Sequence, residues 1–158
     1  MKFKRSENYF IRKVLQETKI KEIMAGPVIS IHEDEPFSYV EEKFREHGIR
    51  HLPVIDKENK LVGLITQKDL YRIVPPRRLD DGSWHYDKEM LDNVILKSVM
   101  IPEPRTFRPE APIADALLEM AQTKYGCFPI IDKEGMLCGI ITQIDIIKIA
   151  AQILKEAA

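Results

Sequence analysis

The sequence has few of the features that mark membrane, secreted or nucleic-acid-binding proteins. No stretch approaches the roughly 18 uninterrupted apolar residues that a membrane-spanning helix requires. The apolar run Tyr9–Ile11 is interrupted at once by Arg12 and Lys13, which is too short for a secretory signal. The 24 basic and 25 acidic residues leave a net charge of -1, so no overall positive field is present to hold a polyanion. We therefore expect a cytoplasmic protein that associates with neither membranes nor DNA or RNA.

Metal and disulfide chemistry is also poorly represented. The only two cysteines, Cys127 and Cys138, lie in apolar runs that read as buried strands, and they offer neither a disulfide framework nor a zinc-ligand set. The four histidines show no metal-ligand spacing with acidic or cysteine partners. The acidic run Glu33–Glu35 precedes a predicted helix and is expected to stabilise its N-terminal dipole. We expect two free core thiols, no metal and no cofactor.

Recognisable catalytic motifs are missing as well. The chain has no nucleophile elbow, no phosphate-binding Walker loop and no dinucleotide fingerprint, and no Ser-His-Asp set can be assembled from local motifs. Its 158 residues are 44% hydrophobic and 31% charged, which is typical of a packed globular protein. We therefore predict no catalytic residues and a protein that is not an enzyme.

An internal repeat is the strongest positive signal. The run His51–Glu58 recurs as Cys127–Glu134, 76 residues later and without a gap. Two copies of one supersecondary unit are therefore expected. The same offset relates further pairs: Met24 to Met100, Pro36 to Pro112, Gly63 to Gly139, Thr66 to Thr142, and Asp69 to Asp145.

Each copy predicts the same order of elements. A short β-rich run (28–31 or 104–107) precedes an amphipathic helix that Pro36 or Pro112 opens, because proline is tolerated in the first helical turn. Two β-rich runs joined by a charged turn follow, at 52–55 and 61–65 and again at 128–131 and 136–141. A closing helix begins near Gln67 or Gln143. The sequence therefore predicts an α/β fold with two tandem β-α-β-β-α repeats.

The remaining segments lie before and between the repeats. Apolar residues at helical spacing predict an N-terminal helix, and Pro75-Pro76 ends the first closing helix. A turn at 80–83 and a helical segment around 89–96 follow. The aromatic segment Trp84–Tyr86 either fixes this linker to the module or is free to stack on a base or meet a partner, and the sequence does not decide between these. The predicted boundaries are an N-terminal helix at 1–19, repeat 1 at 20–74, a linker at 75–95 and repeat 2 at 96–158.

Two matching strings carry the candidate binding chemistry. Gly63–Asp69 and Gly139–Asp145 each deliver a threonine to the start of a helix and place an aspartate one turn into it. A carboxylate can accept hydrogen bonds from the two hydroxyls of a ribose, and the N-terminus of a helix attracts phosphate. The alternative is an ordinary capping box, in which threonine and aspartate satisfy the first backbone N–H groups. The occurrence of the motif in two equivalent positions favours a ligand.

These motifs together resemble the CBS domain family in its common two-domain arrangement. The resemblance rests on Met24 and Met100, on the strands that end at Asp56 and Asp132, and on the duplicated Gly-x-x-Thr-x-x-Asp strings, and it runs from about residue 20 to about residue 149. It implies one CBS-pair module with pseudo-twofold symmetry, which often dimerises further. It also implies two clefts between the repeats that bind AMP, ADP, ATP or S-adenosylmethionine.

The resemblance also implies which residues line the clefts. For the first cleft they are Arg50, His51, Leu64, Thr66, Lys68 and Asp69, with Tyr125 and Gly126 from the other repeat. For the second cleft they are Cys127, Ile140, Thr142, Ile144 and Asp145, with Ile49 and Arg50 from across the axis. Because the second cleft has Ile144 in place of Lys68 and lacks the Arg-His pair, we expect the first to prefer phosphorylated ligands and the second to take a less anionic compound.

We therefore expect a regulatory module that binds an adenosine compound, forms a homodimer and passes a ligand-dependent conformational or oligomeric change to a separate regulated protein. One alternative is a structural dimerisation or docking module with vestigial nucleotide sites, in which the aspartates are dispensable for partner association. A second is a nucleotide-processing enzyme, which a product assay would reveal.

Overall fold

The computed structural model describes residues 5–156, so the ends of the predicted N-terminal and second-repeat segments, 1–4 and 157–158, lie outside it. The chain divides into two compact units. Unit 1 combines Met1–Val28 with Arg105–Glu134 and Cys138–Ala158, and unit 2 combines Ile29–Pro104 with Gly135–Leu137. Unit 2 thus contains most of repeat 1 and the chain that leads into the second half of the sequence. Unit 1 contains most of repeat 2 and the first 28 residues of the chain.

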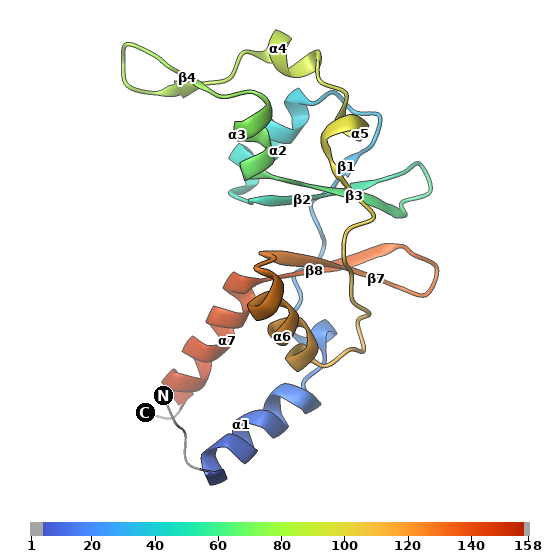
Figure 1. The fold of residues 1–158 in the computed structure, drawn as a ribbon, viewed down its shortest axis with the longest axis vertical. Coiled ribbons are helices and arrows are strands. Elements are labelled where there is room, and N and C mark those ends of the chain that lie inside the picture. The colour runs from blue at the N-terminus through green and yellow to red at the C-terminus, as the bar shows by residue number, and fades with distance from the viewer. Residues whose placement is uncertain (1–4, 157–158) are drawn as a thin grey trace. The chain divides into compact units, whose positions relative to one another are not determined.

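Unit 2 is a four-stranded sheet covered by helices. Its strands run in the order β1 (Ile31–His32), β2 (His51–Ile55), β3 (Leu61–Thr66) and β6 (Ile101–Pro102), with β1 parallel to β2 and the other neighbours antiparallel. Helices α2 (Ser38–His47) and α3 (Gln67–Ile73) lie on one side of this sheet (Figure 1). Alternating strand residues and the apolar helix faces meet in one core, because residues on a strand point to opposite faces in turn. That core contains Ile31, Phe37, Val40, Phe44, Leu52, Val54, Ile65, Leu70, Val74, Leu91 and Leu96.

The segment that follows α3 differs in detail from its prediction. A two-stranded hairpin, β4 (Arg77–Arg78) with β5 (Trp84–His85), surrounds the expected turn, and two short helices, α4 (Lys88–Asp92) and α5 (Leu96–Val99), replace the single helical segment. The strands are two residues long, which is too short to give an alternating pattern in the sequence. Asp87 caps α4 by accepting from the N–H groups of Glu89 and Met90, and α4 ends at Asp92, before the C-cap Asn93, a residue type that is unfavourable inside helices.

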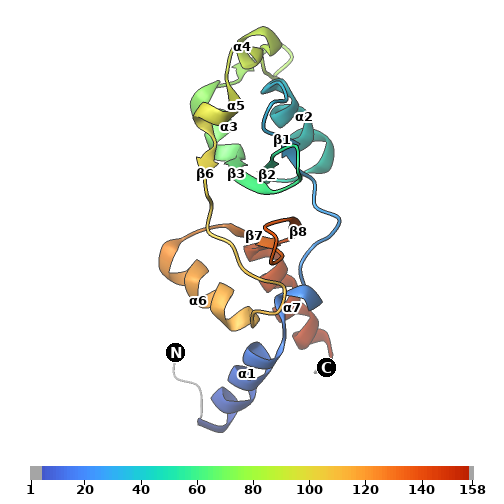
Figure 2. The ribbon, with the colours of Figure 1, turned by 90° about the vertical axis from the view of Figure 1, so that its right-hand side faces the viewer.

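Unit 1 has a related architecture with a two-stranded sheet, and isolated bridges at Phe107–Ile130 and Ala25–Ile140 stand where unit 2 has its outer strands. Helices α6 (Ile113–Thr123) and α7 (Gln143–Glu156) lie on one side of the hairpin formed by β7 (Cys127–Ile131) and β8 (Leu137–Thr142) (Figure 2). The first helix, α1 (Arg5–Glu17), packs against α6, and a short 3-10 helix, η1 (Ile20–Glu22), follows it. The core of this unit contains Ile20, Ile113, Ala116, Met120, Phe128, Ile130 and Ile141.

In each unit, a segment from near the start of the other repeat pairs with the third strand. In unit 2, Ile101 pairs with Leu64 of β3, and the Met100 side chain lies over Gly63. In unit 1, Ala25 pairs with Ile140 of β8, and the Met24 side chain lies over Gly139. These contacts explain why a methionine stands near the start of each repeat and a glycine stands in each third strand.

Candidate functional site

The first Thr-x-x-Asp motif lies in unit 2, where β3 passes directly into α3. Thr66 is the N-cap of α3, and its N–H and Oγ1–H both donate to Asp69 Oδ2, at 3.0 and 2.5 Å. The Asp69 N–H donates back to Thr66 Oγ1 at 3.3 Å. The capping box that the sequence offered as the alternative to a ligand site is therefore present, and any ligand has to use what the cap leaves.

The cap uses only one oxygen of the Asp69 carboxylate. The other oxygen, Oδ1, lies 3.9 Å from the Arg72 guanidinium, and the side chain is 18% exposed. An ionised carboxylate offers about four acceptor positions, so Oδ1 can still accept hydrogen bonds from hydroxyl groups. Arg72 was not among the predicted site residues, although its spacing of three residues from Asp69 on a helix was a signal for contact.

Arg50 and His51, at the start of β2, lie beside the same junction of β3 and α3. The Gln67 N–H donates to the Arg50 carbonyl at 2.9 Å, and His51 is the strand partner of Thr66. Arg50 is exposed and His51 is half-buried, so both side chains stand beside the helix start that Thr66 caps. Gln67 was also missed by sequence reasoning, because its contribution comes from a backbone N–H.

The His51 imidazole differs from its sequence-based interpretation. The sequence analysis counted the Arg-His pair as favouring phosphorylated ligands, but burial, followed by the charge of Arg50, lowers the pKa of His51 below its ordinary value of 6.5. At neutral pH His51 is therefore the neutral imidazole, which still donates one N–H, and the positive charge of the pair belongs to Arg50.

This shift predicts an acid-sensitive contribution to stability. Because the pKa of His51 is lower in the folded than in the unfolded chain, the contribution is complete above pH 6.5 and is lost as the pH falls from there towards the folded pKa. Urea unfolding at pH 7.5 and pH 5.5 should show a smaller loss of stability for His51→Gln than for the unchanged chain. The exposed His47→Gln is the control, and equal losses in the unchanged chain and His51→Gln would contradict the prediction.

The second motif lies in unit 1, where β8 passes into α7. Thr142 N–H and Oγ1–H donate to Asp145 Oδ2 at 2.8 and 2.7 Å, and Asp145 N–H donates to Thr142 Oγ1 at 3.4 Å. The Gln143 N–H donates to the Gly126 carbonyl at 3.1 Å. The backbone scaffold of the first motif is thus reproduced.

The side chains around the second motif are different. Cys127, at the position of His51, is 4% exposed, and burial raises the pKa of its thiol to about 12. Ile144, at the position of Lys68, is 42% exposed, and Tyr125 is 52% exposed with its ring edge against Phe128. The second motif therefore has the same cap and carboxylate but no cation at these two positions.

The structure distributes the predicted site residues over both units. Unit 2 contains Ile49, Arg50, His51, Leu64, Thr66, Lys68 and Asp69, and unit 1 contains Tyr125, Gly126, Cys127, Ile140, Thr142, Ile144 and Asp145. Within each unit these residues gather at one strand-to-helix junction. The joint lining of a cleft by residues of both repeats stays a prediction.

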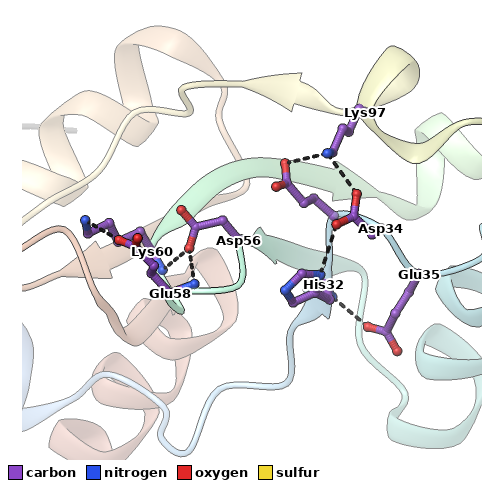
Figure 3. Close-up of polar contacts among 8 residues, drawn as sticks. His32, Asp34, Glu35, Asp56, Glu58, Lys60 and Lys97 are labelled. Carbon is purple, nitrogen blue, oxygen red and sulfur yellow. Dashed lines mark hydrogen bonds and ion pairs between the residues drawn. The ribbon is translucent and has the colours of Figure 1, made fainter.

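The acidic run after β1 makes a contact that the sequence analysis did not predict. Lys97 of α5 pairs with both Glu33 and Asp34, with Nζ 3.4 Å from Glu33 Oε2 and 2.8 Å from Asp34 Oδ1. Figure 3 shows the contact between Lys97 and Asp34. The hydrogen bond from Lys97 lowers the pKa of Asp34. Two of the three carboxylates therefore pair with the start of repeat 2, and the expected effect of the acidic run on the dipole of α2 stays a prediction.

Two other expectations can be compared with the described residues. Among residues 5–156, no group of three or more His, Cys, Asp or Glu side chains is placed to hold a metal ion. In the same part of the chain, no helix has the length and apolar character to cross a membrane.

The aromatic segment of the linker divides its roles. Tyr86 packs against the core of unit 2 and stacks with Tyr71, whereas Trp84 is 67% exposed. Of these two side chains, Tyr86 therefore fixes the linker.

Comparisons with known sequences agree on one family for this chain. A sequence model of the CBS domain matches residues 20–75 and 96–152. A CBS domain-containing protein from Dictyostelium discoideum is 27% identical over 137 residues, which cover 86% of this chain and 93% of that protein. A homoserine O-acetyltransferase from Methanohalobium evestigatum is 27% identical over 139 residues, which cover 88% of this chain but 25% of the enzyme. The chain thus spans nearly all of one curated relative and a quarter of another.

Solved structures with the same fold include ligand complexes. The CBS domain pair of a protein in complex with 5′-methylthioadenosine and S-adenosyl-L-methionine has a TM-score of 0.70 and 22% identity, covering 85% of this chain and 97% of that chain. The protein CBSX2, from Arabidopsis thaliana, in complex with AMP has a TM-score of 0.70 and 23% identity over the same shares of the two chains. At these identities the likeness establishes the fold.

Proposed function

Because this chain belongs to the CBS domain family, we propose that it is a regulatory module that binds adenosine-containing ligands at its two Thr-x-x-Asp motifs. Structures of the same fold were solved with AMP, 5′-methylthioadenosine and S-adenosylmethionine, which supports an adenosine compound as the ligand class. The observation that carries the proposal is the duplicated junction of strand and helix, in which the cap uses a single oxygen of the aspartate.

The two motifs should hold ligands of different charge. In the first, Asp69 Oδ1 accepts from the ribose hydroxyls, and Arg50, Lys68 and the N–H of neutral His51 meet the phosphate. In the second, Asp145 takes the ribose, while Cys127 and Ile144 supply no charge to a phosphate. We therefore propose that the first motif selects AMP, ADP or ATP and that the second is weaker or takes a less anionic compound such as S-adenosylmethionine.

Binding would act by shifting a conformational or oligomeric equilibrium. A ligand changes such an equilibrium only by its different affinity for the two states. The proposed output is therefore a change in the conformation or oligomeric state of the module, which a separate regulated protein recognises. It is not a chemical reaction. The relatives that are named as enzymes match this chain over a quarter or less of their own length, which supports a regulatory and not a catalytic part.

A thermal-shift panel tests the proposal and separates it from a docking module. AMP, ADP, ATP, S-adenosylmethionine and NADH are each added to the full chain. A ligand at about a hundred times its Kd adds roughly 2.7 kcal/mol, which should raise Tm by about 5–10 °C for a chain of this size. A selective shift is expected for at least one adenosine compound. Flat curves for all five would contradict the proposal and favour a docking module with vestigial sites.

A further inference from the structure

Arg72, an exposed residue of α3, is the one cation among the described residues that forms an ion pair with a motif aspartate. Its guanidinium lies 3.9 Å from Asp69 Oδ1, the carboxylate oxygen that the cap of α3 does not use. The contact follows from the helix, because residues three apart lie on the same helical face. Arg72 therefore stands beside the oxygen to which the proposed function assigns the ribose hydroxyls.

The distance between the two groups shows what kind of contact this is. It exceeds the range of about 2.7–3.2 Å for an N–H···O hydrogen bond, so the attraction between Arg72 and Asp69 is one of charge alone. The Arg72 side chain is 72% exposed, whereas the Asp69 side chain is 18% exposed and bonded to Thr66. Arg72 can therefore leave Oδ1 without breaking a hydrogen bond, while the cap holds the carboxylate in place.

The second motif has no such pair. The repeat offset relates Arg72 to Lys148, which is exposed on α7 three residues beyond Asp145. Among the residues that the structure describes, neither Lys148 nor Asp145 forms an ion pair. A cation at this helical position is thus not sufficient for the contact, and the pair of Arg72 with Asp69 distinguishes the first motif from the second.

We propose that Arg72 is a specificity-determining residue of the first motif, an inference that rests on the proposed function. Without ligand it pairs with Asp69 Oδ1, and ribose hydroxyls that donate to this oxygen displace it. A neutral nucleoside offers the displaced guanidinium no new partner, so the lost pair lowers its affinity. A 5′-phosphate on the same ribose lies within about one Debye length, roughly 8–10 Å, of Oδ1, and arginine matches the geometry of phosphate. Arg72 thus disfavours the nucleoside and favours the nucleotide.

Adenosine and AMP test this assignment, because they differ only in the phosphate. Titration of the isotope-labelled full chain gives the Kd of each compound from the amide resonances of Thr66 and Asp69, which report on the first motif. Arg72→Gln should bind adenosine about 1.4–5-fold more tightly, the range for loss of an exposed ion pair. Its affinity for AMP should stay the same or fall, because the phosphate loses a partner. The preference for AMP over adenosine should therefore fall by at least the same factor.

Salt supplies a second readout that a purely structural role of Arg72 would not change. The difference in AMP preference between Arg72→Gln and the unchanged chain should shrink at high ionic strength, because salt screens exposed charges. Arg72 is exposed, and glutamine is about as good a helix former as arginine, so the variant should fold, which circular dichroism checks.

Lys148→Gln is the matched control, since it removes the same charge from the equivalent position of α7 and should leave both Kd values at Thr66 and Asp69 unchanged. The inference is overturned if Arg72→Gln does not bind adenosine more tightly, if AMP gains affinity by the same factor, or if Lys148→Gln has the same effect. If the unchanged chain binds neither compound at this motif, the proposed function fails together with the inference, so the two failures are distinguishable.

Discussion

Substitution of Gly63 by alanine is expected to lower the free energy of unfolding by about 1–3 kcal/mol, the usual range for an overpacked site. A Cβ built on Gly63 would lie 2.9 Å from Met100 Cγ and closer still to Sδ. The clash includes Cγ, so the whole methionine side chain and not only its flexible end has to move. Met100 packs against the core of unit 2, where a new position for it displaces other side chains.

The same contact supplies a second test and a control. Gly63→Ala combined with Met100→Ala should be more stable than the sum of the two single effects predicts, since the second change removes the atoms that clash. Gly26→Ala is the matched control, because its Cβ would lie 3.8 Å from the nearest atom, an ordinary contact. If chemical denaturation found Gly63→Ala as stable as Gly26→Ala, the proposed packing of Met100 would be wrong.

Asp69→Ala is expected to weaken AMP binding by about tenfold to a hundredfold, because hydrogen bonds to a charged group contribute about 1.5–3 kcal/mol. The variant also loses the capping box of α3, which lowers stability by about 0.5–2 kcal/mol irrespective of ligand. Isothermal titration below the melting temperature separates these effects, because it measures affinity for the folded chain.

Asp145→Ala is the matched variant, since Asp145 makes the same three hydrogen bonds with Thr142. It should lose comparable stability but keep tight AMP binding at the first motif. Loss of AMP binding in Asp145→Ala with retention in Asp69→Ala would reverse the proposed order of the two motifs.

Much of the architecture was predictable because it depends on local pattern. The apolar period and the ungapped repeat predicted two tandem β-α-β-β-α units, and the family match and the structures of the same fold confirm this. Gln67 and Gln143 do begin the closing helices. The capping geometry of Thr66 and Asp69 was offered as an alternative to a ligand site, and the structure has it.

The features that were missed depend on contacts between distant segments or on very short elements. Glu33 and Asp34 pair with Lys97, more than sixty residues away in the sequence, so no local pattern indicated the contact. The exchange that brings Met24 onto Gly139 is invisible to a division of the chain into consecutive repeats. The lowered pKa of His51 follows from burial, which a sequence does not report. The domain boundaries and the ligand-binding residues stay predictions.

We expect an adenosine ligand to bind at the strand-to-helix junctions that Thr66 and Thr142 cap. The most direct test is a titration of the isotope-labelled chain with AMP, followed through backbone amide resonances. We expect saturable shifts centred on residues 66–69 and on Arg50 and His51, with smaller or later shifts at 142–145. Saturable shifts elsewhere with both junctions unchanged, or no saturable shift at either junction, would contradict it.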